Sequence, residues 1–237
     1  IMESIPIEDS QDWWWYKAKS NTLNLILNSL KTNKRLRILE IGPGKGNNLN
    51  TLTKYGDVDI LENDLGFIRF IKEKNPNVVS SYFTDFDEVT EIYDLIILLD
   101  VVEHIKDTDK FFRSINKILA DEGHIVISVP AYKSLWSEHD VRLKHFRRYT
   151  WNTLLNEVKD YEVIKRIGFN YILLPIRYLQ IKFSKNISTT NENSNLLNII
   201  LFQISKIEHF LRILKFNPKF GISLFILVKK ISTESLD

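Results

Sequence analysis

Short apolar runs alternate with amphipathic segments along residues 20–160. Each short run is rich in Ile, Leu and Val and predicts a buried strand, whereas the intervening segments repeat apolar residues at helical spacing. The run YDLIILLD at 93–100 contains five consecutive apolar residues, which is typical of a parallel strand buried on both faces. Asp107 and Gly123 stand where the N-cap and the C-terminal stop of one helix are expected. The pattern predicts strands at 36–41, 57–62, 78–84, 93–100 and 124–130, and helices at 21–31, 48–55, 65–74 and 107–123.

The pattern changes after residue 160. Segments 161–169 and 220–230 predict two more strands, but the stretch between them is far longer than the usual ~2–6 residues of a connection. It contains two helix-like segments, 171–183 and 195–216. Together the elements predict an α/β fold: a doubly wound, Rossmann-like sheet of seven mostly parallel strands, with helices on both faces and a helical insertion before the last strand. The expected parts are an N-terminal cap with the first helix (1–34), a ligand-binding core (35–169, with a lid segment at 131–150), the insertion (170–219) and the last strand with a tail (220–237).

The amino-acid composition excludes several classes of protein and several kinds of site. The 237 residues suffice for one α/β domain, and 44% hydrophobic with 26% charged residues is ordinary for a soluble globular chain. A net charge of +2 gives no reason to expect a nucleic-acid partner. The absence of cysteine excludes disulfides, thiolate metal sites and cysteine nucleophiles. No secretory signal and no apolar stretch of ~20 residues is evident, so we expect a cytoplasmic protein.

The stretch ILEIGPGKGNNL at 38–49 places Gly42, Gly44 and Gly46 directly after a predicted strand. A dinucleotide-binding turn, G-x-G-x-x-G, would need its third glycine at 47, where the chain has Asn47. The Lys-Ser/Thr ending of a phosphate-binding P-loop is also missing. The turn therefore predicts a nucleotide-like ligand without a fitted pyrophosphate site.

This turn resembles motif I of the class I S-adenosylmethionine (SAM) methyltransferases, in the methyltransferase type 11/12 group. The resemblance implies SAM as cofactor, S-adenosylhomocysteine (SAH) as product, and close approach of the methionyl part to Gly42, Gly44 and Gly46. It also implies a carboxylate after the second strand that accepts both ribose hydroxyls. Two acceptor oxygens suit two adjacent donors, and Glu62, followed by Asn63, stands at that place.

The same resemblance implies two further contacts. Asp85 would receive the adenine amino group, with Phe86 beside the ring. Glu40 would order water near the SAM amino group or simply anchor the turn. Other acids compete for these roles: Asp59 and Asp64 with Glu62, and Asp87 with Asp85.

LLDVVEHI at 98–105 resembles the fourth-strand motif of the branch that includes the ubiquinone-biosynthesis O-methyltransferases. In that branch an acid-x-x-Glu-His pattern, here Asp100, Glu103 and His104, has been associated with a divalent metal. The alternative is that Glu103 and His104 shape the pocket through hydrogen bonds. We expect no metal and assign Asp100 to the cofactor site.

Methyl transfer is an in-line displacement that often requires removal of one proton. A histidine is suited to that task. His124 opens a predicted strand at its amino end, and His209 lies in the insertion, so the catalytic candidates are His104, His139 and His145.

Two aromatic segments are candidate substrate contacts. Segment 131–150 resembles a "WSxHD…H(F/Y)RRYT" signature in a bacterial branch of the family; the alternative is a lid closed by internal ion pairs such as Asp140 with Arg147. DWWWYKAK at 12–19 resembles a "WW(F/Y)xxR" run of the same branch, with Lys19 in the place of Arg. We expect this segment to be a cap that excludes water from the site; the alternative is an anchor at a membrane interface. The substrate candidates are Trp14, Trp15, Tyr16, Trp136, Arg147, Arg148 and Tyr149.

The insertion at 170–219 is basic. It holds seven Lys or Arg against two Glu, a net charge of +5. Basic amphipathic helices favour anionic membrane surfaces. The segment therefore predicts peripheral contact with the inner membrane face and a lipid-linked acceptor; the alternatives are a dimer interface or a plain cover over the sheet.

The leading interpretation is a SAM-dependent methyltransferase acting on an oxygen of a small or lipid-linked acceptor. Alternatives are N-methylation of an amino sugar or similar metabolite, a non-catalytic SAM-binding protein, and an NAD-dependent oxidoreductase. DNA amino-methyltransferases are disfavoured because the chain has DVVE where they carry Asn/Asp-Pro-Pro-aromatic. We expect a monomer or homodimer.

Overall fold

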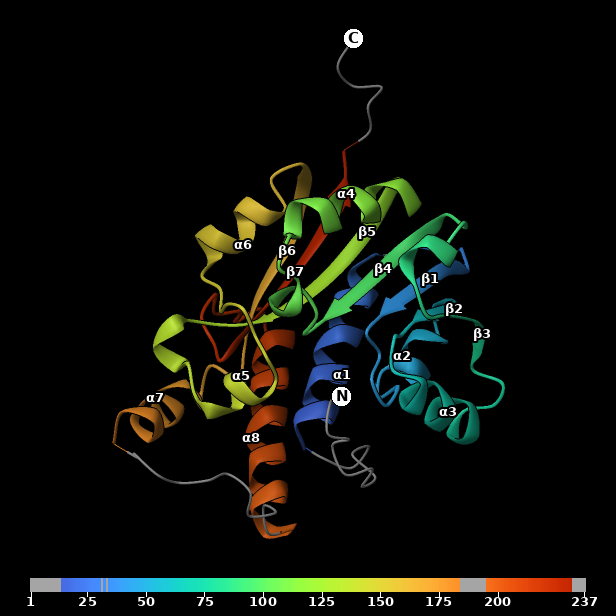
Figure 1. Cartoon of the computed structure of the whole chain (residues 1–237). Helices are drawn as coiled ribbons and strands as arrows, with labels where there is room; N and C mark the ends of the chain where they lie inside the picture. Colours follow the sequence, from blue (N-terminus) through green and yellow to red (C-terminus); the bar gives the residue numbers. More distant parts are fainter. Residues whose placement is uncertain (1–13, 31, 33, 184–194, 232–237) are drawn as a thin grey trace.

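The computed structural model describes residues 14–30, 32, 34–183 and 195–231. Its centre is one seven-stranded sheet with helices on both faces (Figure 1). The strand order is β3-β2-β1-β4-β5-β7-β6, and only β7 runs antiparallel to its neighbours. The strands are β1 (Leu36–Ile41), β2 (Gly56–Leu61), β3 (Val79–Phe83), β4 (Tyr93–Leu99), β5 (Leu119–Pro130), β6 (Tyr161–Phe169) and β7 (Ser223–Lys230). The predicted Rossmann-like, mostly parallel architecture is confirmed.

Two apolar layers sandwich the sheet. In the central strand β4, Leu95 and Ile97 point into one layer, whereas Ile96 and Leu98 point into the other. All four side chains are fully buried, which explains the unbroken apolar run in this segment. The helices are α1 (Trp14–Leu27), α2 (Leu49–Leu52), α3 (Leu65–Lys74), α4 (Thr108–Ile118), α5 (Glu138–Arg142), α6 (Trp151–Glu157), α7 (Leu174–Phe183) and α8 (Asn195–Ile213).

Three predicted element boundaries were wrong. The helix predicted at 107–123 begins as expected after the N-cap Asp107, but it ends at Ile118. Leu119 pairs with Tyr93 of β4, so residues 119–123 extend strand β5, and Gly123 stops no helix. The first helix begins at Trp14 rather than residue 21, and the helix after the glycine turn is a single turn.

The helical insertion lies between β6 and β7, as predicted, and contains α7 and α8. Helix α8 packs along α1, and both stand at the edge of the sheet where the parallel strands end (Figure 1). Among the helices in the described ranges, none combines the length and the apolarity needed to cross a membrane.

Candidate active site

The carboxyl ends of the parallel strands gather the predicted site residues at one edge of the sheet, as a doubly wound fold requires. The glycine turn follows β1, Glu62 follows β2, and Asp100 follows β4. The lid segment 131–150 follows β5. Helix α1 completes this edge from the amino-terminal side of the chain (Figure 1).

The glycine turn has a left-handed backbone at all three glycines. Gly42, Gly44 and Gly46 have φ angles of 65°, 54° and 74°. A Cβ at Gly44 would meet no atom within 4 Å, whereas one at Gly46 would lie 2.6 Å from Leu49 Cδ1. The turn is therefore packed against Leu49 at Gly46, whereas the backbone at Gly44 is open. A ligand can approach the backbone at Gly44.

Two buried carboxylates support this turn. Glu40 Oε1 accepts a hydrogen bond from Asn48 Nδ2 at 3.0 Å, but its buried Oε2 has no partner among the described residues. Burial raises the pKa of Glu40 to about 7. Glu62 accepts from the backbone N–H of Gly44 at 3.1 Å and of Asp64 at 3.0 Å, and burial raises its pKa as well.

The acids that competed with Glu62 have other partners. Asp59 lies within β2 and accepts from the Tyr93 hydroxyl at 2.8 Å, and Asp64 caps α3. Asp85 is exposed and caps the short turn Phe86–Glu88, where its carboxylate accepts from the Asp87 N–H. Phe86 packs edge-on against Phe111.

Helix α1 is tied to the strand edge by an ion pair that sequence reasoning missed. The buried Lys19 ammonium contacts Asp100 Oδ2, and Ser128 Oγ donates to Asp100 Oδ1 at 2.9 Å. Asp100 has a left-handed φ of 56°, so the backbone turns sharply at this position. The signal available in the sequence was Lys19 itself, in the place where the resembling run has Arg.

The aromatic residues of α1 face different neighbours. Trp14 is buried, and Trp15 packs edge-on against both Trp14 and Phe169 of β6. Burial and the nearby Asp100 carboxylate raise the pKa of Tyr16. Among these three, Tyr16 is thus the residue whose polar group lies near the strand edge.

A second group joins the loop after β4 to the lid. The rings of His104 and His145 meet edge-to-face with centroids 4.6 Å apart. Glu103 is fully buried, and neither carboxylate oxygen has a hydrogen-bond partner in the described ranges. Burial and the neighbouring Asp100 raise the pKa of Glu103. These three residues each offer one ligand atom, all within 4.8 Å of one another, so they could hold a metal ion.

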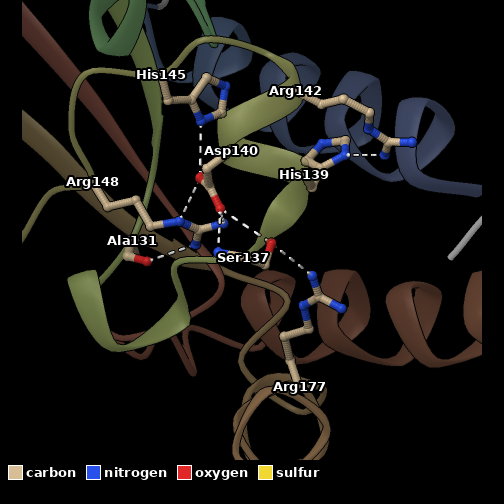
Figure 2. A network of polar contacts seen from close by, with 8 residues as sticks. All are labelled: Ala131, Ser137, His139, Asp140, Arg142, His145, Arg148 and Arg177. Atoms are coloured by element: carbon tan, nitrogen blue, oxygen red, sulfur yellow. Dashed lines mark hydrogen bonds and ion pairs between the residues drawn. The ribbon is translucent and has the colours of Figure 1, made fainter. Parts of the chain in front are cut away.

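The lid is organised around the buried carboxylate of Asp140 (Figure 2). Oδ1 lies 2.9 Å from His145 Nδ1 and accepts from Arg148 Nε at 2.7 Å, while Oδ2 accepts from Arg148 Nη2 and from Ser137. Burial alone would raise the pKa of Asp140, but hydrogen bonds from His145 and Arg148 hold it well below its usual range. The ion pair proposed for a closed lid is therefore Asp140–Arg148, not Asp140–Arg147.

The remaining lid candidates are dispersed. His139 is exposed, with Nδ1 3.3 Å from Arg142 Nη2 (Figure 2). Arg147 donates to the carbonyls of Ile105 and Lys106. Tyr149 is buried in the core below the lid, and Trp136 ends the short turn Lys133–Leu135. The structure thus brings His104 and His145 together and leaves His139 apart from that pair.

Comparison with known proteins gives one matching family and many solved structures with a similar fold. The family model described as "Methyltransferase domain" matches residues 14–174. No curated protein matches the chain. Similar solved structures include a SAM-dependent methyltransferase from Archaeoglobus fulgidus (TM-score 0.56, 17% identity, 89% of this chain and 94% of that one). Others are the N-methyltransferase NodS from Bradyrhizobium japonicum WM9 with SAH (0.55, 14%, 92% and 88%) and coclaurine N-methyltransferase with N-methylheliamine and SAH (0.55, 16%, 88% and 72%). At these identities the likeness concerns the fold.

Proposed function

The chain belongs to the methyltransferase domain family and is a SAM-dependent methyltransferase, and from this premise we propose that it methylates an oxygen atom of a small or lipid-linked acceptor, with His145 as the general base. The observation that carries the proposal is the Asp140–His145 contact at the carboxyl edge of the sheet. Because the ionised Asp140 can only accept, it fixes the proton on Nδ1 and leaves Nε2 able to take a proton.

The residues of the cofactor side fit SAM. Gly44 leaves the backbone open to a ligand, and the unpartnered Oε2 of Glu40 can accept from a donor there. Bound SAM supplies an activated methyl group on a sulfonium. We propose that Glu62 holds the ribose hydroxyls with Asn63 beside it, and that Asp85 and Phe86 hold the adenine. The Lys19–Asp100 pair would then hold α1 beside the bound cofactor.

The choice of oxygen follows from the chemistry of proton removal. An alcohol or phenol must lose its proton as the methyl group is transferred, whereas a neutral amine attacks with its own lone pair. A histidine fixed by a buried carboxylate therefore favours an oxygen acceptor. N-methylation of an amino sugar is the second candidate, since the similar folds include N-methyltransferases. Tyr16, Trp136 and the lid residues Arg147, Arg148 and Tyr149 would border or support the acceptor, with Trp14 and Trp15 behind Tyr16.

A histidine panel tests the base. We expect His145→Gln to lower the methylation rate about 10²–10⁴-fold with unchanged SAH affinity, because the base acts only in the reaction. His104→Gln should have a smaller effect through its contact with the His145 ring, and His139→Gln should stay near wild type. Methyl-labelled SAM with a cell extract, partitioned between organic solvent and water, supplies the assay and the acceptor class. Equal loss in His139→Gln and His145→Gln would contradict the assignment, and tighter stabilisation by NADH than by SAH would contradict the cofactor.

Chelation tests the metal alternative at Glu103, His104 and His145. If His145 is a base, EDTA should leave the label transfer unchanged. Loss of transfer on chelation, with recovery on adding Zn²⁺ or Mn²⁺, would reassign the two imidazoles and the carboxylate to a metal site. Binding of Zn²⁺ to the SAH complex, measured by calorimetry, separates a structural ion from a contaminant.

A further inference from the structure

Helix α8 turns three polar side chains toward the protein and exposes a row of large apolar side chains on its outer face. Ser205, Glu208 and Arg212 are buried on the inner face. Arg212 Nη2 donates to Glu208 Oε2 at 2.9 Å and to the Gly168 carbonyl at 2.8 Å, which anchors the helix to β6. The outer face carries large apolar side chains that are about half exposed: Ile199, Ile200, Ile207, Phe210, Ile213 and, just beyond the helix, Leu214.

The exposed apolar face of α8 extends along much of the helix. Its members lie about three, four or seven residues apart, so they fall on one side of the helix, where the exposed Gln203 stands between Ile200 and Ile207. Helix α7 has no buried residue and exposes Ile176, Leu179 and Phe183, again at helical spacing. Contiguous exposed apolar surface of this kind marks an interaction site on a soluble protein.

The charges beside the stripe identify its partner. Lys206 lies within the exposed face, Lys215 follows the helix, and Lys182 is exposed on α7. In the described parts of the insertion, Glu208 is the only carboxylate, and it is buried in the pair with Arg212. The exposed insertion is therefore apolar and cationic, with no exposed anion among its described residues.

We propose that the outer face of α8 docks the enzyme on an anionic lipid bilayer, with the helix lying in the plane of the headgroups. An apolar stripe flanked by lysines is the combination that inserts below the headgroups and attracts anionic lipids. The inference rests on the proposed function, since α8 stands beside α1 at the strand edge that holds the site, where a lipid-linked acceptor would be presented.

A second copy of the chain is a poorer occupant. A two-fold interface pairs the same patch with itself, so it would bring Lys206 and Lys215 of both copies into one contact. Since no exposed carboxylate lies among the described residues of the insertion, these cations would meet without a counter-charge. An anionic bilayer supplies the opposite charge to every lysine.

Vesicle co-sedimentation tests the proposal. We expect the wild-type protein to bind vesicles of phosphatidylcholine with phosphatidylglycerol and to bind phosphatidylcholine alone much more weakly. Phe210→Glu and Ile207→Glu, both at exposed positions, should each lower the bound fraction by about tenfold or more. Lys206→Glu with Lys215→Glu should remove the preference for anionic lipid. Ile92→Glu, about as exposed but in the loop before β4, is the matched control and should bind like wild type.

Two outcomes would overturn the docking surface. The first is equal binding of Phe210→Glu and wild type to anionic vesicles. The second is a wild-type dimer in light scattering that dissociates in Phe210→Glu, with no vesicle binding by either. SAH affinity and label transfer in detergent, measured on the same variants, keep this test separate from the proposed function, because a failed docking surface leaves both intact.

Discussion

At the glycine turn, left-handed backbone serves two different purposes. Gly44→Ala places its methyl group in open space, so only the backbone conformation, about 1–2 kcal/mol, opposes it. Gly46→Ala in addition drives a methyl group against Leu49. We expect Gly46→Ala to lower the free energy of unfolding more, and Gly44→Ala to lower SAH affinity more relative to its effect on stability. Urea unfolding and calorimetric titration of the two variants check this, and the same ranking in both measurements would contradict it.

Glu40 links the stability of the protein to pH. Its pKa is raised to about 7 by burial, so between about pH 4.5 and pH 7 the unfolded chain ionises this carboxyl while the folded protein keeps it protonated. The group therefore lowers stability progressively as pH rises through that window, by about 3 kcal/mol once the folded carboxyl has ionised.

Replacing Glu40 removes this penalty. We expect Glu40→Gln to raise the free energy of unfolding in alkaline buffer and to leave it nearly unchanged in acid, because both states are then protonated. SAH affinity should fall in the same variant, most clearly in alkaline buffer, because the ionised carboxylate is the better acceptor. Urea unfolding at about pH 4, below the pKa of Glu40 in both states, and at about pH 8 gives the comparison. Glu73→Gln on α3, an exposed carboxyl, is the control, and a stability change independent of pH would contradict the assignment.

Among the elements, α1 is joined to the strand edge by a partly buried ion pair in addition to its apolar core contacts. Lys19 is 5% exposed and Asp100 is 40% exposed, so removing the carboxylate leaves a buried ammonium. In a double-mutant cycle with Lys19→Met and Asp100→Asn, we expect a coupling free energy of about 1–3 kcal/mol. The pair Lys34–Asp94, with its lysine 70% exposed, is the control and should couple by less than about 1 kcal/mol. Equal couplings would mean that α1 is held by its apolar contacts alone.

The elements predicted correctly are those whose pattern depends on burial of both faces. The run at 93–100 is apolar because Leu95 and Ile96 enter opposite apolar layers. Burial on both faces requires an unbroken apolar run, which can be recognised in the sequence alone. The end of α4 was missed because Leu119 leaves the helix to pair with Tyr93, a contact made by tertiary structure. For α8 the sequence showed two unlike faces, but which face turned outward depended on the buried partners of Glu208 and Arg212.

Some parts of the candidate site could likewise be predicted from the sequence, and others could not. Carboxylates at strand ends were predictable, since parallel strands end at one edge of the sheet. Side chains that meet across loops were not: His104 follows β4 and His145 lies in the lid. Contacts between the two loops, such as the hydrogen bond from the Phe146 N–H to the Glu103 carbonyl at 2.9 Å, hold the two segments together. The adjacent residues Arg147 and Arg148 could not be distinguished in the sequence. In the structure Arg147 donates to backbone carbonyls, whereas Arg148 binds the buried carboxylate of Asp140.

On the scale of the whole molecule, the sheet and the insertion differ in how firmly they are held. Strands β4 and β5 lie between two buried layers, whereas α7 buries no side chain and α8 is anchored mainly near Glu208 and Arg212. Local opening free energies follow such differences in burial. In native-state hydrogen exchange we expect α7 amides to exchange first, the carboxyl-terminal half of α8 later, and the β4 and β5 amides last.

SAH and anionic vesicles should slow amide hydrogen exchange in different parts of the molecule. SAH should slow exchange in the glycine turn and α1, the elements that border the proposed cofactor site, and leave α7 unchanged. Anionic vesicles should slow exchange in α7 and α8 without protecting the glycine turn, because the lipid covers the outer face of the insertion. If SAH alone protected α7 and α8 as strongly as the turn, the insertion would be a cover that closes over the bound acceptor, and its apolar face would meet substrate rather than a bilayer.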